Sequence, residues 1–196
     1  MILTIDGKNK IFDGKFLKVW STAFKDTTGK SHEWEWIEGH NFVAILPILD
    51  RSHILLIRLF RVPVEKYVLD VPTGVIDPTD EDPHVAALRE LKEETGYRAD
   101  KLISLPPVPH SPGNSTSMMF PFIATNLEKI FDSKRDAEED IEVVSVPVNS
   151  VISTYMTSAN QLFNIRILGL MHIAIEKGLC DAKIKKGTSQ TSLRRP

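Results

Sequence analysis

Residues 74–97, GVIDPTDEDPHVAALRELKEETGY, hold an acidic segment with clear helix start and stop signals. Asp82 is a good N-cap residue, and Pro83 suits the first helical position because the N–H that it lacks would have no partner there. Gly96 supplies the left-handed residue that ends a helix. The stretch therefore predicts a helix between Asp82 and Gly96.

One face of this helix is predicted to be acidic. At about 100° per residue, three glutamates fall in one sector, and three apolar residues fall on a broad opposite arc. The glutamates are Glu90, Glu93 and Glu94, and the apolar residues are Val85, Leu88 and Leu91. Two small residues, Ala86 and Ala87, flank the acidic sector. We therefore expect an acidic face that is separate from the core face.

The crowded carboxylates favour a bound cation. Like charges on one helix face are mutually destabilising, and only the Arg89 to Glu93 pair offers local compensation. Carboxylate oxygens suit hard divalent ions, and the segment has no Cys or His pair for zinc. We expect Mg²⁺, with Mn²⁺ as a substitute; the alternative is a solvated acidic surface.

Residues 89–97, Arg-Glu-Leu-Lys-Glu-Glu-Thr-Gly-Tyr, preceded by Glu81 and Gly74, resemble the Nudix box G-x5-E-x7-R-E-U-x-E-E-x-G-U, where U is a bulky apolar residue. Six residues instead of five separate Gly74 from Glu81, so either the loop has an insertion or Asp80 takes the glutamate's place. The resemblance implies an α/β Nudix fold, with a mixed β-sheet sandwiched between helices and an N-terminal antiparallel sheet subdomain.

The resemblance also implies roles for residues of the box. The metal ligands would be the Thr73 carbonyl and the carboxylates of Glu81, Glu90, Glu93 and Glu94. Arg89 would orient a glutamate instead of contacting substrate. The ions would clamp a diphosphate and lower the pKa of a water, which makes Glu90, Glu93, Glu94 and Arg89 the catalytic set.

The segment before the box predicts three strands, over residues 42–49, 54–60 and 67–71. The resemblance implies a substrate-facing arginine after the second strand, where Arg58 and Arg61 are available. Guanidinium makes paired charge-assisted bonds to diphosphates, and we favour Arg61. Arg58 has a surface ion pair as its alternative. Asp70 stands where the family often has the longer Glu, and we assign it no role.

Residues 1–38 predict short strands at 2–5, 16–24 and 33–37, with turns at 6–7 and 26–29. Aromatic residues are concentrated here, and their ordinary role is on a sheet face or in a core. The ADP-ribose pyrophosphatase branch of the Nudix family, which this chain resembles, implies a homodimer formed by residues 1–40. It also implies an aromatic grip on adenine, by Trp34 and Phe16.

Further strands are expected at 101–105, 120–124 and 141–146, and a final helix at 158–178 with Leu162, Ile165, Leu168 and Ile175 on its core stripe.

Pro112 lies sixteen residues beyond Gly96, and a proline at this offset resembles the ADP-ribose pyrophosphatase branch. The alternative is that the proline belongs to a rigid connector. Ser117 stands where many bacterial members carry a proposed general base. Glu139 or Glu142 could supply that base or a metal ligand, unless this charged run is a solvated turn.

The composition describes one ordinary globular domain: 196 residues, 42% hydrophobic and 26% charged. No apolar run approaches the roughly 20 residues of a membrane helix, and the start lacks a signal-peptide pattern. The single Cys180 favours a cytoplasmic setting. The net charge is −2. Residues 181–196 hold five basic residues and one acidic residue, Asp181, so residues 1–180 carry a net charge of −6. A body with this charge is a poor nucleic-acid binder.

The expected parts of the chain are a dimerising sheet at 1–40, the Nudix domain at 41–180, and a disordered basic tail at 181–196.

The resemblance implies hydrolysis of the pyrophosphate bond of ADP-ribose, or a close nucleoside diphosphate sugar, to AMP and ribose 5-phosphate. The expected partners are that small molecule and a second copy of the chain. Two alternatives stay open: a pyrophosphatase for UDP-glucose or GDP-mannose, and a catalytically impaired module that senses ADP-ribose.

Overall fold

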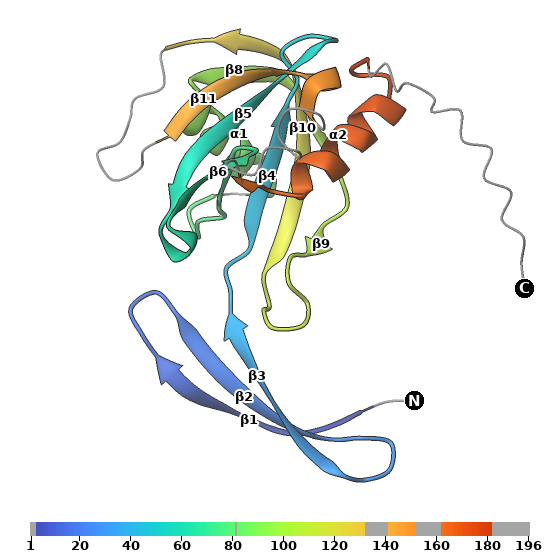
Figure 1. Cartoon of the computed structure of the whole chain (residues 1–196). Coiled ribbons are helices and arrows are strands. Elements are labelled where there is room, and N and C mark those ends of the chain that lie inside the picture. Colours follow the sequence, from blue (N-terminus) through green and yellow to red (C-terminus); the bar gives the residue numbers. More distant parts are fainter. Residues whose placement is uncertain (1–2, 81, 132–140, 152–161, 182–196) are drawn as a thin grey trace, which may run out of the picture.

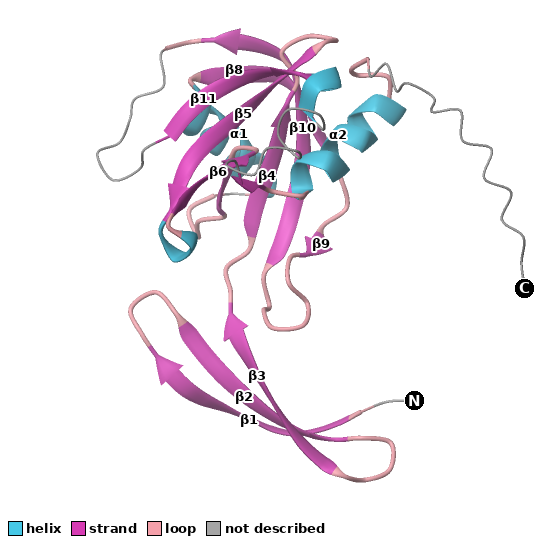
Figure 2. Ribbon diagram, viewed as in Figure 1, coloured by secondary structure: helices cyan, strands magenta, loops and turns pink. Residues whose placement is uncertain are grey.

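The chain folds into β-sheets flanked by helices, with one small sheet set apart from the rest (Figures 1 and 2). The structure, a computed structural model, describes residues 3–80, 82–131, 141–151 and 162–181. The strands are β1 (Thr4–Asp13), β2 (Lys18–Lys25), β3 (Ser31–Glu38), β4 (Phe42–Pro47), β5 (His53–Arg61), β6 (Lys66–Asp70), β7 (Thr73–Val75), β8 (Tyr97–Ser104), β9 (Val108–Pro109), β10 (Met118–Lys129), β11 (Ile141–Pro147) and β12 (Leu162–Phe163). The helices are α1 (Pro83–Thr95) and α2 (Arg166–Glu176), and short 3₁₀ turns cover Val62–Val64 and Val148–Ser150.

The N-terminal sheet is antiparallel in the order β1-β2-β3, and β3 leads directly into β4 (Figure 1). The predicted turn at residues 26–29 is confirmed: Gly29 has a φ of 86°, and the Asp26 carboxylate accepts the Thr28 N–H at 2.8 Å. The predicted turn at residues 6–7 is wrong. β1 continues through it with a register shift between Ile5 and Gly7, because a bulge absorbs the extra residue without ending the strand.

The remaining strands form two mixed sheets. One has the order β7-β4-β10-β8, with β9 added to β10, and the other has the order β11-β5-β6-β12. The pairs β4–β10 and β6–β12 are parallel, whereas the other neighbours are antiparallel. The mixed sheet expected from the sequence is therefore present, divided into two.

Strand β4 shows how the layers are built. Successive side chains of a strand point to opposite faces of its sheet. Val43 and Ile45 pack toward α1, and Ala44 and Leu46 join a larger cluster with β5, β6 and α2. Helix α1 therefore covers one face of the five-stranded sheet, and the other face meets the second sheet and α2. This confirms the predicted α/β class.

The second helix is shorter than predicted. It begins at Arg166, because Leu162 and Phe163 pair with β6 and the Asn164 side chain accepts the Arg166 N–H. The expected stripe is wrong at Leu162, which belongs to β12, and at Ile165, which is 68% exposed. The buried residues of α2 are Ile167, Leu170, Met171 and Ala174.

Five sequence expectations fall wholly or partly on residues that the structure does not describe. Glu81, Glu139, residue 2 of the expected first strand, residues 158–161 of the expected final helix and residues 182–196 of the basic tail lie outside the described ranges. Within the described ranges, no helix has the length and apolar character needed to cross a membrane.

Candidate active site

Helix α1 is built as its sequence predicts. The Asp82 carboxylate accepts the N–H groups of His84 at 2.7 Å and Val85 at 3.0 Å, Pro83 occupies the first turn, and Gly96 ends the helix with a φ of 75°. These caps fix where the helix starts and stops, and so fix which residues face the sheet.

We expected the acidic face of α1 to be separate from its core face. Instead, the two faces border each other. Ala86, Ala87 and Leu91 are fully buried, whereas Val85 is 38% exposed. The alanines let the helix pack closely on β4 and β10, and this turns the helix toward its glutamate side. The expected placement of Val85 and of the alanines is therefore wrong, and only Leu91 packs as predicted.

Two glutamates are consequently half-buried beneath the strand that precedes the helix. The Glu90 carboxyl lies against the Cα of Gly74, so closely that a Cβ there would overlap with it. Glu94 accepts the Thr73 N–H at 2.8 Å. The third glutamate, Glu93, points outward, and its side chain is 58% exposed.

Arg89 ties the acidic helix to the loop that follows β7. Its guanidinium donates to Glu90 at 2.6 Å, to Glu93 at 3.0 Å and to the Val75 carbonyl at 3.1 Å. It also donates twice to Asp80, at 3.0 and 3.3 Å, and these bonds lower the pKa of that carboxyl below its ordinary value of 3.8. These contacts hold the Arg89 guanidinium between helix α1 and the loop that follows β7.

These contacts bear on the extra residue in the loop. Asp80, whose side chain is only 5% exposed, is one of the carboxylates that hold the Arg89 guanidinium. It also accepts the Asp77 N–H at 2.8 Å, which closes a tight turn. Asp80 therefore anchors the loop to the helix, while Glu81 lies outside the described residues.

A charged cavity of about 500 Å³ opens over Glu90 and Glu94. Arg61, the residue expected to face the substrate, lines this cavity together with Arg166, which has no role in the sequence-based prediction. The full lining is His40, Phe42, Arg61, Thr73, Gly74, Val75, Glu90, Glu94 and Arg166. Two carboxylates and two guanidiniums on one cavity suit a polyanionic ligand held with a cation.

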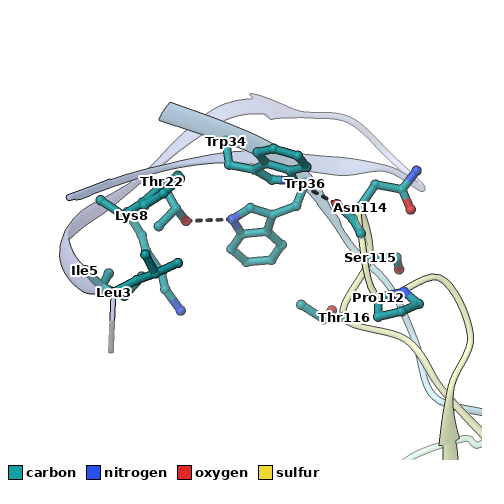
Figure 3. Close-up of a pocket in the computed structure, with 12 residues that line it drawn as sticks. Leu3, Ile5, Lys8, Thr22, Trp34, Trp36, Pro112, Asn114, Ser115 and Thr116 are labelled. Atoms are coloured by element: carbon teal, nitrogen blue, oxygen red, sulfur yellow. Dashed lines mark hydrogen bonds between the residues drawn. The ribbon is translucent and has the colours of Figure 1, made fainter. Parts of the chain in front are cut away.

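A second, apolar pocket of about 530 Å³ lies between the N-terminal sheet and the loop of residues 112–116 (Figure 3). Trp34 and Pro112, far apart in sequence, both line it, and the Trp34 indole N–H donates to the Gly113 carbonyl at 2.8 Å. Trp36 lies alongside and donates to the Thr22 hydroxyl at 2.7 Å. The pocket offers flat apolar walls that suit a planar ring.

Comparison with known proteins now decides the family. A family model of the NUDIX domain matches residues 39–163. The chain belongs to the Nudix family. It is similar to the ADP-ribose pyrophosphatase of Bacillus subtilis (strain 168), with 32% identity over 147 residues, covering 74% of this chain and 78% of that protein. It is also similar to the ADP-sugar pyrophosphatase of Mus musculus, with 30% identity over 165 residues, covering 76% of this chain and 75% of that protein.

A solved structure confirms the Nudix fold. The crystal structure of an ADP compounds hydrolase matches with a TM-score of 0.77 and 26% identity, over 91% of this chain and 96% of that one. Together with the family match, this confirms that the chain is an enzyme, a Nudix hydrolase. The predicted family and fold are therefore correct.

Nudix hydrolases generally act with divalent metal ions. Among the described residues, no three acidic, His or Cys side chains converge closely enough to enclose an ion, and Arg89 contacts both Glu90 and Glu93. The donors nevertheless fit a hard cation, because Glu90 and Glu94 present carboxylate oxygens to one cavity and no thiolate lines it. Among the described residues of this Nudix hydrolase, Glu90 and Glu94 are therefore the ones that could hold such an ion.

Several predicted site residues lie away from both cavities. Phe16 is 85% exposed in the turn between β1 and β2, where the Lys15 ammonium lies 4.7 Å from its ring centroid. Arg58 pairs with Glu142 at 3.1 Å on the surface, the alternative given for it above. Ser117 hydrogen-bonds with Ser115 and lines neither cavity.

Arg166 and Asp70 are the site residues that sequence reasoning missed. Asp70 is 1% exposed and lies 3.2 Å from the Arg166 guanidinium. Burial raises the pKa of Asp70, against the opposing charge of Arg166. An aspartate that ends a buried strand and an arginine 96 residues later give no local pattern, so only the fold reveals the pair.

Proposed function

We propose that this Nudix hydrolase cleaves the diphosphate of ADP-ribose, or of a close ADP-sugar, with Mg²⁺ and releases AMP and ribose 5-phosphate. The observation that carries the proposal is the pairing of two cavities. An aromatic pocket built on Trp34 lies near a charged cavity that contains Glu90, Glu94 and Arg61. The named activities of the relatives from Bacillus subtilis and Mus musculus support the same substrate class.

The cavities are close enough for one nucleotide. Trp36 lines the apolar pocket and His40 lines the charged cavity. Four residues of extended chain span at most about 14 Å. A molecule with an aromatic base at one end and a diphosphate in its middle can therefore occupy both.

Each group of residues has a defined role in the proposal. Trp34 and Pro112 contact the adenine, and Arg61 binds the diphosphate through its guanidinium fork. Glu90 and Glu94, with Glu93, Glu81 and the Thr73 carbonyl, hold the cation. When bound, the ion supplies charge neutralisation at the phosphate oxygens and activation of a water.

Arg89 keeps Glu90 in place through its bonds to Asp80 and Glu90 itself. Glu139 is our proposed general base, on the strength of the family resemblance alone. No covalent nucleophile is required, because a water positioned in line can attack the phosphorus directly.

We further propose that residues 1–40 form a homodimer interface. All ten residues of β1 are exposed, including Ile5, Ile11 and Phe12, each more than half exposed. A fully exposed edge strand that carries three large apolar side chains is an unusual surface for a monomer. Phe16, which lines neither of the two cavities described above, would then reach the adenine pocket of the partner. Light scattering coupled to size-exclusion chromatography tests this: a particle of one 22.1 kDa chain at micromolar concentration would overturn it.

The function is tested with a panel of ADP-ribose, ADP-glucose, UDP-glucose and GDP-mannose, incubated with Mg²⁺ and scored for released monophosphates. The proposal predicts the highest kcat/KM for an ADP-sugar and no turnover with a chelator. Preferred turnover of a UDP- or GDP-sugar would overturn the substrate while keeping the chemistry. Tight binding of ADP-ribose without turnover at any metal concentration would indicate the sensing module.

A further inference from the structure

Arg166, the first residue of α2, is a buried cation on the wall of the charged cavity. Its side chain is 13% exposed, and it lines the cavity with Arg61, Glu90 and Glu94. It comes from the helix on the other side of the sheet from α1, so two distant parts of the chain meet at this cavity.

Two contacts fix the position of its guanidinium. Nε lies 3.2 Å from Asp70 Oδ1, and Asp70 is itself held by the Val71 N–H at 2.8 Å and the Asn164 amide at 3.0 Å. The guanidinium carbon lies 5.4 Å from the ring centroid of Phe42, which stiffens the arrangement. Arg166 is therefore pre-organised before any ligand arrives.

Its hydrogen bonds are incomplete. Nε and Nη1 are both buried and have no hydrogen-bond acceptor in the described part of the chain, since the approach to Asp70 is an ion pair without hydrogen-bond geometry. Buried charged donors normally find acceptors, because leaving them unsatisfied is costly. Burial lowers the pKa of Arg166 against the opposing charge of Asp70, and the second positive charge of Arg61 lowers it further.

An anion in the cavity would face both guanidiniums at once. We propose that Arg166 binds the diphosphate of the substrate and that Asp70 and Asn164 act as positioning residues for it. The inference rests on the proposed function to the extent that the substrate carries a diphosphate. Glu90 and Glu94 lie on the helix α1 side of the cavity and carry negative charge. The phosphate oxygens would therefore contact the arginines and the cation.

Inorganic pyrophosphate is the probe that isolates this contact from the rest of the nucleotide. Its affinity is measured by calorimetry without metal for the wild type, for Arg166→Lys and for Arg58→Lys. Lysine keeps the charge near Asp70 but loses the planar fork. We expect binding to Arg166→Lys to weaken by about 10- to 100-fold, the range for losing hydrogen bonds to a charged group.

Arg58→Lys is the matched control, because Arg58 pairs with Glu142 on the surface of β5 and lines neither cavity. Its pyrophosphate affinity should equal that of the wild type. Equal affinity of Arg166→Lys and the wild type, or no binding of pyrophosphate to the wild type, would overturn the inference.

A second variant covers the case in which Arg166→Lys folds poorly. The double variant Asp70→Asn with Arg166→Gln replaces the buried ion pair with neutral groups, a change that proteins often tolerate. We expect it to retain adenosine binding and to lose pyrophosphate binding. Retained pyrophosphate binding in this folded variant would count against the inference.

Kinetics then separate this inference from the proposed function. With ADP-ribose as substrate, Arg166→Lys should lower kcat/KM by the same 10- to 100-fold. The affinity for adenosine should stay unchanged. If Arg166→Lys loses pyrophosphate binding and the wild type does not hydrolyse ADP-ribose, only the proposed substrate is overturned. Normal ADP-ribose hydrolysis by Arg166→Lys would overturn only the role of Arg166.

Discussion

A methyl group at Gly74 would occupy the space that the Glu90 carboxyl fills, which makes Gly74→Ala a sensitive test of the site. The new Cβ would lie 1.8 Å from the Glu90 carboxyl carbon, and carbon atoms make ordinary contact at about 3.5–4.0 Å, so the carboxyl would have to retreat by about 2 Å. A misplacement of about 1 Å in a catalytic group can cost about 100-fold in rate. We therefore expect kcat for ADP-ribose with Mg²⁺ to fall by about 100-fold.

The loss should come from geometry and not from unfolding. The overlap is with the end of a flexible side chain, and overpacking of this kind costs about 1–3 kcal/mol. Gly169→Ala in α2 is the control, because nothing lies within 4 Å of its new Cβ. That variant should keep full activity and gain about 0.5–1 kcal/mol of stability.

Steady-state kinetics at saturating Mg²⁺ and thermal unfolding of the three proteins complete the test. If Gly74→Ala stays folded and keeps kcat within about threefold of the wild type, Glu90 does not act from the position described here.

Three further predictions concern other residues of the site. Glu94→Gln should lower kcat by at least about 100-fold. The unfolding midpoint should change little, since the amide oxygen can still accept the Thr73 N–H. Near-normal turnover would show that Glu94 is not a metal ligand. Trp34→Ala should raise KM for ADP-ribose by about 5- to 150-fold with a smaller effect on kcat, and Trp34→Phe should recover part of this; an unchanged KM would contradict the adenine pocket. Burial raises the pKa of Asp70, so its carboxyl contributes most stability below pH 3.8 and loses that contribution as pH rises through the raised pKa. The unfolding free energy of the wild type minus that of Asp70→Asn should therefore fall as pH rises above 3.8, and a rise would show that the Arg166 charge outweighs burial.

Helix α1 could be predicted because its signals are local. An Asp cap, a Pro in the first turn and a closing Gly act within a few residues of the helix, and the structure contains all three. The three strands before the helix were also predicted to within a residue or two, since their apolar runs are continuous.

The direction in which α1 packs was predicted wrongly for a physical reason. Helical periodicity alone favours the bulky apolar arc as the buried one, but the fit of small residues against a sheet can outweigh it. Ala86 and Ala87 permit close packing on β4 and β10, and this leaves Val85 exposed and Glu90 half-buried.

The Asp70–Arg166 pair could not be predicted, because its partners meet only through the fold. β12 pairs in parallel with β6, and this brings Asn164 and Arg166 beside the end of β6. The same short strand, which a helical pattern hides, explains why the final helix begins later than its sequence suggests.

The most direct test is a crystal structure with Mg²⁺ and a non-hydrolysable ADP-ribose analogue. We predict an ion coordinated by Glu90 and Glu94, a diphosphate against Arg61 and Arg166, and an adenine against Trp34. An analogue bound elsewhere, or a bound analogue with Glu90 and Glu94 making no contact with any ion, would contradict it.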